Sequence, residues 1–599
     1  MKKQFIYQTL CGLAFASVAL LLPSCLDYDV PSDEFSQTEV TVDDTIYHGA
    51  ADSIGYTHVP TEAGMTAALA ELSTPLRQAK GGIYAMRGGK EGNAPGSHSY
   101  QRQYTLGPDN YAQFSVVPHY DFMYGTLSHT YAVSKEFNPG PYSCFVIAKN
   151  AFVPVLNRPE IDSIPELKAT FLLLYDYVSQ EVADLYGPFP YVNYKANKTD
   201  APFTYNDLRT IYVNIEDNLD TIVACYKHFD TKPAWYQAKV KQLFSTYFSE
   251  LNPAKATDMQ TWIRFANSFK LRLAIHTVKA DAALAQAWGE EAVADGVIES
   301  VDDEILMAPF VTGFSHPLMD ISETWGDTRL SASFESLLIS LNHPYADYLF
   351  LKNGNVLINS KTGASLKAGS RLAGMREGIE PGYGQSYSTN QLIACSRVDP
   401  EVLGAWGVPL YLMKLSEVDF LRAEGALRGW AMGGDAATFY NRGIDYAYLE
   451  WREMGPNQYT ERLDEYKAQT KPVAYTYVDP TGSSDDIESV TKIGVKWDES
   501  DTREVKLEKI ITQKYIAAYP YSYEPWVDMR RTGYPKMFPV LNPQNGDGSL
   551  KAGGIIRRMP FALTDDASIV DIQTTGLSAL GGSDLQATRL WWDVDTSNF

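Results

Sequence analysis

Apolar side chains recur every three or four positions over one stretch in the first third of the chain. They stand at Leu167, Phe171, Leu174, Tyr175, Val178, Val182 and Leu185. This spacing places all of them on one face of a helix. Gly187 and Pro188 follow directly, and such a pair is typical of a helix end. The pattern predicts a helix over residues 167–185.

Two further helices have recognisable starts. Thr204 and Asp207 precede a helix whose apolar face carries Tyr212, Ile215, Leu219 and Ile222. Thr257 stands three residues before Gln260, which is the spacing of a capping box. The helix that it starts has an apolar face made of Trp262, Phe265, Phe269 and Leu273. More helices are predicted over 281–294, 411–429, 436–453, 459–468 and 505–519.

The predicted helices recur in pairs, without a clean repeat of fixed length. Such pairing indicates a scaffold of the tetratricopeptide kind, and we expect a mainly α protein with little strand. Between the helices lie long stretches rich in Gly, Pro, Ser, Thr, Asp and Asn, and loops of this length usually carry function. These stretches are 81–125, 300–330, 345–405, 470–500 and 535–599.

Composition adds limits on size and partners. With 45% hydrophobic residues among 599, the chain has enough apolar material for a large core, and no Pro/Ser/Gly-rich linker divides it. We therefore expect one large domain over residues 56–599. The net charge of −22 repels the phosphate backbone of nucleic acids and argues against a basic face that binds anionic lipid.

The N-terminus has the layout of a bacterial lipoprotein signal peptide. Lys2 and Lys3 precede an apolar run from Phe5 to Leu22, which leads through Ser24 to Cys25. We expect residues 1–24 to be removed and Cys25 to carry the lipid, palmitate included. The alternative is a plain transmembrane helix, which needs about 20 apolar residues; this run is short and polar at its start.

The residues that follow Cys25 are acidic. Eight Asp and Glu residues and no Lys or Arg lie between Leu26 and Asp52, so residues 25–55 are expected to form a tether. Asp27 and Asp29 either help to route the lipoprotein to the outer face of the membrane or belong to a solvated leader.

Motifs for catalysis or metal binding are missing. The sequence contains no H-E-x-x-H, G-x-S-x-G or C-x-x-C, which zinc hydrolysis, a nucleophile elbow and dithiol chemistry require. His276 lies inside a predicted helix and is interpreted as a structural histidine. Residues 545–548 form a turn rather than a calcium loop, and we expect no cofactor. Three thiols remain after cleavage, and we expect them to be buried or inert: Cys144, Cys225 and Cys395.

Several segments, taken in order, resemble the SusD/RagB family, surface lipoproteins of glycan-harvesting Gram-negative bacteria that act with SusC-type TonB-dependent transporters. They are Asp184–Tyr191, Trp262–Leu273, Leu415–Trp430, Ile511–Ile516, Trp526, Arg530–Pro535, Arg557–Pro560 and Trp591–Asp593. Asn342–Tyr345 and Ala373–Gly378 depart from the turns such proteins often show. Most matched aromatics are interpreted as core, and Arg530 and Arg531 as ties between loops and helix ends.

The resemblance implies a helical scaffold, a binding face built from loops, and docking as a lid over a transporter barrel in the outer membrane. It also implies a surface protein that captures oligosaccharides, passes them to a SusC-like transporter and is not an enzyme. The open alternatives are the same architecture with peptide or other non-glycan cargo, a surface glycoside hydrolase with two facing carboxyls, and a structural adhesin.

A sugar site needs aromatic planes for the C–H face and amide or charged groups for the hydroxyls. The family places part of its ligand face in an early segment, which here contains Tyr84, Arg87, Asn93, Tyr100 and Tyr104. The other part corresponds to residues 321–329, with Trp325 and Asp327, where Trp325 is the leading candidate. Two tyrosines form a third candidate loop, Tyr383 and Tyr387. For each aromatic, the alternative is a ring that only pins its own loop.

Overall fold

The structure is a computed structural model. It describes residues 40–88, 96–119, 127–307, 316–381, 389–405, 408–447 and 458–599. The helices belong to one compact unit, Val42–Phe599. Cys25, Asn93, Tyr383 and Tyr387, all named above as candidates, lie outside the described residues.

Helices dominate the described part of the chain. The longer ones are α2 (Glu62–Ala85), α5 (Gly140–Leu156), α6 (Pro165–Tyr186), α8 (Leu208–His228), α9 (Ala234–Tyr247), α10 (Met259–Thr277), α11 (Ala282–Asp295), α13 (Ala332–Ser340), α16 (Leu415–Leu427), α17 (Ala436–Tyr446), α19 (Gln458–Lys467), α20 (Arg503–Ala518) and α21 (Tyr523–Thr532). The short ones are α3 (Ser97–Tyr100), α4 (Pro108–Tyr111), α7 (Tyr191–Lys195), α14 (Tyr345–Tyr348), α15 (Pro400–Ala405), α22 (Asp566–Asp571) and α23 (Leu577–Leu580). This confirms the mainly α fold.

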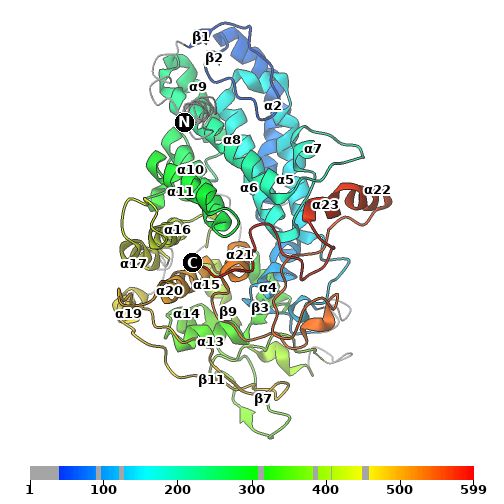
Figure 1. The fold of residues 1–599 in the computed structure, drawn as a ribbon, viewed down its shortest axis with the longest axis vertical. Coiled ribbons are helices and arrows are strands. Elements are labelled where there is room, and N and C mark those ends of the chain that lie inside the picture. The colour runs from blue at the N-terminus through cyan, green and yellow to red at the C-terminus, as the bar shows by residue number, and fades with distance from the viewer. Residues whose placement is uncertain are drawn as a thin grey trace, which may run out of the picture. The chain divides into compact units, whose positions relative to one another are not determined.

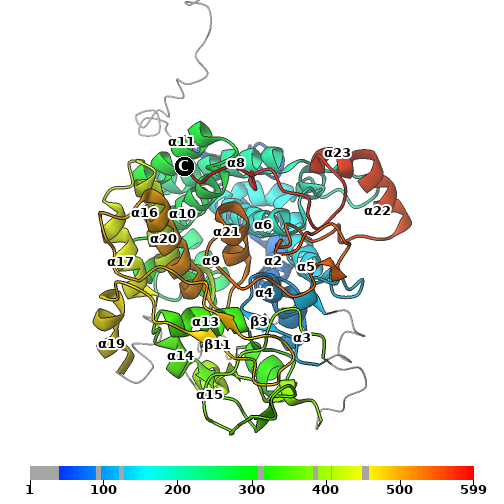
Figure 2. The ribbon, with the colours of Figure 1, turned by 60° about the horizontal axis from the view of Figure 1, so that its bottom comes forward.

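Neighbouring helices pack in pairs. α5 lies against α2 and α6, α8 lies against α6 and α10, α10 lies against α11, and α16 lies against α17. Figure 1 shows α2, α5, α6 and α8 side by side. In both views α13, α14 and β11 lie together at the opposite end of the unit from α8 (Figure 2).

Most predicted helices are confirmed, with small changes at their ends. α6 covers the stretch predicted over 167–185 and ends at Gly187, which has φ +92°. Asp207 caps α8 by accepting a hydrogen bond from the Thr210 N–H. α10 is capped by Asp258 rather than by Thr257, because the Asp258 carboxylate accepts from the Gln260 N–H. A carboxylate one position later displaces the predicted capping box.

The strands form short two-stranded sheets. β3 (Ser115–Val116) pairs with β5 (Arg329–Leu330), β4 (Ile305–Met307) with β10 (Leu410–Met413), β6 (Phe350–Leu351) with β9 (Arg397–Val398), β7 (Leu357–Ile358) with β8 (Ser365–Leu366), and β11 (Thr476–Tyr477) with β12 (Ile487–Glu488), all antiparallel. The remaining strands are β1 (Thr41–Val42) and β2 (His58–Val59). Low strand content is therefore confirmed.

One predicted helix start is wrong. The helix expected from residue 411 begins at Leu415, because Leu410–Met413 form the fully buried strand β10 and Lys414 is the N-cap of the helix. A short apolar run does not distinguish a buried strand from a helix. Pairing with β4, which lies about a hundred residues earlier in the sequence, decides in favour of the strand.

The matched aromatics build the core, as predicted. Trp262, Trp526 and Trp592 have no exposed surface, and Trp430 is also buried. Trp591 is half-buried and packs edge-on against Tyr212, with 5.6 Å between the ring centres. The three thiols are free and buried, which confirms that expectation. Within the described ranges, no helix has the length and apolar character that crossing a membrane requires.

Residues 49–53, inside the stretch predicted to be a tether, are held against the helices. The Lys168 ammonium, only 1% exposed, donates to the carbonyls of Ala50 (2.8 Å) and Ser53 (2.7 Å). The Asp52 carboxylate pairs with Lys195 at 2.7 Å. Buried ammonium groups need such acceptors, so this part of the acidic segment is packed rather than free.

Candidate functional site

The loop that carries Trp325 is a compact turn. The π-helix η7 (Asp320–Thr324) ends where the Trp325 N–H donates to the Asp320 carbonyl at 2.8 Å. Gly326 has φ +73°, a conformation that favours glycine, and it turns the chain toward β5. The half-buried Trp325 indole stacks on the exposed His98 ring, with 4.5 Å between ring centres and 19° between planes. The two rings thus form a stacked pair, called the Trp325 platform below, in which each ring covers one face of the other.

Two carboxylates fix this loop to the early segment of the chain. Asp320 accepts a hydrogen bond from the Ser97 hydroxyl (2.6 Å). Asp327, only 5% exposed, accepts from Gln101 (2.6 Å) and contacts the His119 ring at 2.8 Å. Both oxygens of Asp327 are therefore engaged, and this candidate residue holds the loop in place.

A wide polar hollow of about 620 Å³ is lined in part by Glu323 and Arg329, which flank Trp325 in the sequence. Glu323, at the end of η7, is ion-paired with Arg397 on β9. The hydrogen bond from Arg397 lowers the pKa of Glu323, which keeps this carboxylate ionised. Amide side chains line much of the remaining wall, from Asn355, Asn390 and Gln391.

Asn355, Gln391 and Arg397 are not among the residues that the sequence singled out. They lie in the loop-rich stretch 345–405, where only the two tyrosines were named. The available signal was the polar composition of that stretch, which does not single out individual residues.

The early candidates lie inside the protein. Tyr84 is 6% exposed and donates its hydroxyl to Glu250. Arg87 is 3% exposed and paired with Glu181 at 2.9 Å. Tyr100 and Tyr104, at 0% and 1%, pack on each other with 4.6 Å between ring centres. The structure therefore does not bring these four side chains together with Trp325 at the surface. Tyr84, Tyr100 and Tyr104 lie on α2, α3 and η1 (Gln101–Thr105), and Arg87 follows directly after the C-cap of α2.

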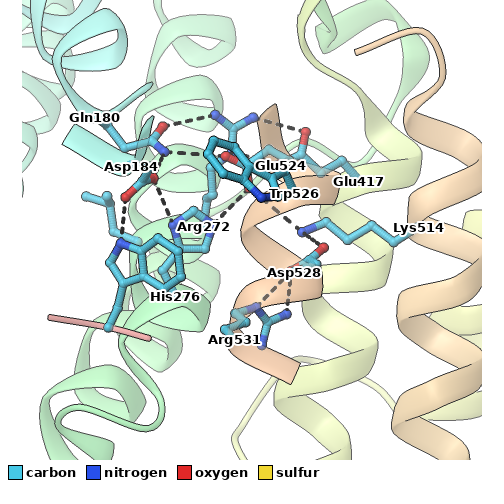
Figure 3. Close-up of polar contacts among 12 residues, drawn as sticks. Gln180, Asp184, Arg272, His276, Glu417, Lys514, Glu524, Trp526, Asp528 and Arg531 are labelled. Carbon is cyan, nitrogen blue, oxygen red and sulfur yellow. Dashed lines mark hydrogen bonds and ion pairs between the residues drawn. The ribbon is translucent and has the colours of Figure 1, made fainter. Parts of the chain in front are cut away.

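A buried network of charges lies deeper, among α6, α10, α16, α20 and α21 (Figure 3). His276 Nε2 is 2.8 Å from Glu524, and Nδ1 is 3.4 Å from Asp184. Arg272 donates two hydrogen bonds to Glu417, at 2.8 and 3.0 Å. Because every charge faces an opposite charge, these contacts tie the helices together. The structural role predicted for His276 is confirmed.

Two groups of side chains, one of three carboxylates and one of two carboxylates with His276, have the spacing of a metal site in the described part of the chain. In one of them, formed by Glu216, Asp220 and Glu291, the Lys270 ammonium sits 2.7, 2.7 and 2.8 Å from the three carboxylates. In the other, the His276 ring stands between Asp184 and Glu524. A side chain of this protein thus supplies the positive charge at both places.

The comparisons with known proteins agree with this architecture. The chain shares 30% identity with a chitin-binding SusD homolog from Flavobacterium johnsoniae, with a TM-score of 0.73, over 87% of this chain and 100% of that one. It shares 25% with a SusD homolog from Bacteroides vulgatus (TM-score 0.71; 89% and 99%) and 26% with one from Bacteroides ovatus (0.69; 87% and 100%). No curated protein matches the sequence.

A family model matches over residues 59–593, which is nearly the whole of the helical unit. Its description is SusD-like, SusD and RagB outer membrane lipoprotein. The chain therefore belongs to the SusD-like family of outer membrane lipoproteins.

Proposed function

We propose that this protein binds a glycan on the cell surface and delivers it to a SusC-like TonB-dependent transporter without cleaving it. A lipid on Cys25 would anchor it to the outer membrane. The observation that carries the proposal is the polar hollow lined by Glu323 and Arg329, which flank the stacked Trp325 in the sequence.

The geometry suits a carbohydrate. A sugar ring packs its C–H face on an aromatic plane and offers its hydroxyls to amides and charged groups. The platform supplies the plane, and the hollow lined by Glu323 and Arg329 supplies Asn355, Gln391 and Arg397. The residues that line the hollow come from η7, β7, η8 (Gln391–Ala394) and β9. We therefore expect it to contact several sugar units.

The relatives support the same class of ligand. The Flavobacterium johnsoniae protein is described as chitin-binding and matches along its full length. We therefore place chito-oligosaccharides first among the glycans to be tested, because their acetamido groups match the amide-lined wall. Peptides and other non-glycan nutrients are the second class.

The proposal that the protein is not an enzyme has a physical basis. Glycoside hydrolysis uses two carboxyls about 5–10 Å apart, one of them protonated. Among the described residues that line the hollow, Glu323 is the only carboxylate, and its hydrogen bond from Arg397 lowers its pKa. An ionised, ion-paired carboxylate is a poor general acid.

The test is calorimetry of the mature protein with a panel of polysaccharides and their oligosaccharides, chitin fragments included. We expect Trp325→Ala to weaken binding about five- to thirtyfold, because loss of one aromatic stacking partner costs on the order of 1–2 kcal/mol. Trp497→Ala is the matched control, since Trp497 is also half-buried but packs near Tyr440, 5.1 Å between ring centres.

Each result has a distinct meaning. Binding of one polymer that is lost in Trp325→Ala but kept in Trp497→Ala supports both the function and the site. Binding kept in both variants moves the site away from Trp325. No binding to any glycan would favour peptide cargo, and release of shorter products would contradict a non-catalytic role.

A further inference from the structure

The amide side chains of the polar hollow leave hydrogen-bond donors available along its wall. Gln391 Oε1 already accepts a hydrogen bond from the Ile358 N–H at 2.7 Å. Asn355 Oδ1 likewise accepts from the Val356 N–H at 2.8 Å. Because a backbone N–H can donate but not accept, these bonds fix which end of each amide is the oxygen. The NH2 groups of the exposed Asn355 and Gln391 have no hydrogen-bond partner among the described residues.

Arg397 adds a cationic donor to the same wall. Its Nε donates to the Glu323 carboxylate, whereas Nη1 and Nη2 have no hydrogen-bond partner in the part of the chain that the structure describes. A methyl group on Gly354, which also lines the hollow, would lie 3.5 Å from Nη1, and the Arg397 side chain is 21% exposed. The two NH2 groups of a guanidinium match the two oxygens of a carboxylate.

The segment that builds this wall is basic in an acidic protein. From Phe350 to Val398, which spans β6 to β9, the chain carries six Lys and Arg residues against two Asp and Glu residues, whereas the whole chain has a net charge of −22. Lys352 and Lys367 are exposed and have no acidic partner among the described residues. Lys352 follows Leu351, which pairs with Arg397 across β6 and β9. The local field at this wall therefore attracts anions.

We infer that the hollow selects glycans that contain a uronate, a sugar unit whose carboxylate binds Arg397 and the two amide NH2 groups. The inference rests on the proposed glycan-binding function and names the class of glycan. An acetamido group offers one neutral oxygen to the same donors, so it gains less from a guanidinium than a carboxylate does. Glu323 neutralises part of the charge of Arg397 and therefore opposes the binding of an acid.

The probes are oligosaccharides of polygalacturonate, alginate and hyaluronan, each compared with the same oligosaccharide after reduction of its carboxyls to alcohols. Hyaluronan fragments alternate glucuronate with N-acetylglucosamine, so chito-oligosaccharides of equal length are a second neutral control. Binding to the mature protein is measured by calorimetry. We expect at least one acidic oligosaccharide to bind about tenfold more tightly than its reduced form, the effect of one charge-assisted contact. Raising the salt concentration from about 0.05 M to about 0.5 M should reduce this difference.

Two variants of the same ion pair separate ligand binding from a structural role. Arg397→Gln removes the guanidinium and should weaken binding of the acidic oligosaccharide about tenfold, with little effect on the reduced form. Glu323→Gln removes the competing carboxylate and should strengthen binding of the acid about threefold. Because both variants break the same pair, a merely structural role would weaken binding in both.

Lys361→Gln is the matched control for the loss of one positive charge. Lys361 lies in the hairpin between β7 and β8 and pairs with Asp485 at 2.7 Å, and it does not line the hollow. We expect this variant to keep both the affinity for the acidic oligosaccharide and the preference over its reduced form.

The outcomes separate this inference from the proposed function. Binding that is equal for acidic and neutral forms, or confined to neutral ones, would remove the selectivity and leave the glycan function in place. A preference that Arg397→Gln does not lessen would move the carboxylate away from this wall. Weaker binding of the acid in both Arg397→Gln and Glu323→Gln would make their ion pair structural. Failure of every glycan to bind, chitin fragments included, would contradict the proposed function together with the inference.

Discussion

His276 shows how single residues tie distant segments together. Its two ring nitrogens face Glu524 and Asp184, from α21 and α6. Burial by itself would lower the pKa of His276, but the two carboxylates raise it to about 9. At neutral pH the ring is therefore a cation that joins three helices.

This arrangement makes the free energy of unfolding depend on alkaline pH. The pKa of His276 is higher in the folded protein than in the unfolded chain, so its stabilisation is complete below about pH 6.5 and is lost as the pH rises through about 9. Replacing the residue by glutamine removes the cation that faces Asp184 and leaves Glu524 with the more distant Arg272 (3.7 Å) and Lys514 (4.0 Å). We expect His276→Gln to cost about 3–5 kcal/mol at pH 6.

The measurement is urea unfolding of both proteins between pH 6 and pH 9.5. The difference in the free energy of unfolding between wild type and His276→Gln should become smaller as the pH rises. Buried carboxyls such as Asp109, whose pKa burial raises to about 7, titrate in both proteins and cancel in this comparison. A difference that stays constant with pH would mean that His276 is neutral in the folded state.

At the level of elements, short irregular segments position the candidate site. η7, the turn at Gly326 and β5 present Trp325, while α3 presents His98. The helical periodicity in the sequence identified α6, α8 and α10 because each has a continuous apolar face. It did not identify η7, whose five residues are too few to show a period.

The turn at Gly326 offers a test of this positioning. Gly326 has φ +73°, where a Cβ costs about 1–2 kcal/mol. We expect Gly326→Ala to lose about that much stability and to weaken glycan binding by displacing Trp325. Gly363→Ala is the control, since Gly363 has φ +72° and open space around it but lies in the hairpin between β7 and β8. Equal loss of binding in both variants would show that backbone strain, not the position of Trp325, is responsible.

At the level of the whole molecule, buried polar contacts join segments near both ends of the helical unit to its helices. Near the C-terminus, the Trp592 indole donates to Asp184 at 2.7 Å and the Met559 N–H donates to the Leu185 carbonyl at 2.8 Å. Near the start of the helical unit, Lys168 takes its acceptors from Ala50 and Ser53. Both ends of the unit are thus attached to α6.

The contacts of Lys168 and Lys195 with residues 50–53 predict where the N-terminus can be shortened. A form that begins at Val42 keeps the acceptors of Lys168 and the partner of Lys195. A form that begins at Tyr56 loses them and leaves a buried ammonium with Asp162 alone, at 2.6 Å. We expect the shorter form to unfold more easily, by on the order of 3 kcal/mol, as measured by urea denaturation. Equal stability of the two forms would show that residues 42–55 contribute nothing to the fold.

The sequence alone determined the fold class, most helix positions and the core aromatics. Apolar periodicity, and the Gly and Pro residues that end helices, are local properties of a sequence. Its ordered motifs also pointed to the family. The tertiary structure decided which loop residues meet. Tyr100 and Tyr104 look like sugar-binding aromatics in sequence but are buried, since their exposure depends on elements distant in the chain. Asn355, Gln391 and Arg397 line the same hollow as Glu323 of η7 only because segments distant in the sequence fold together there, a long-range packing outcome that no local pattern encodes.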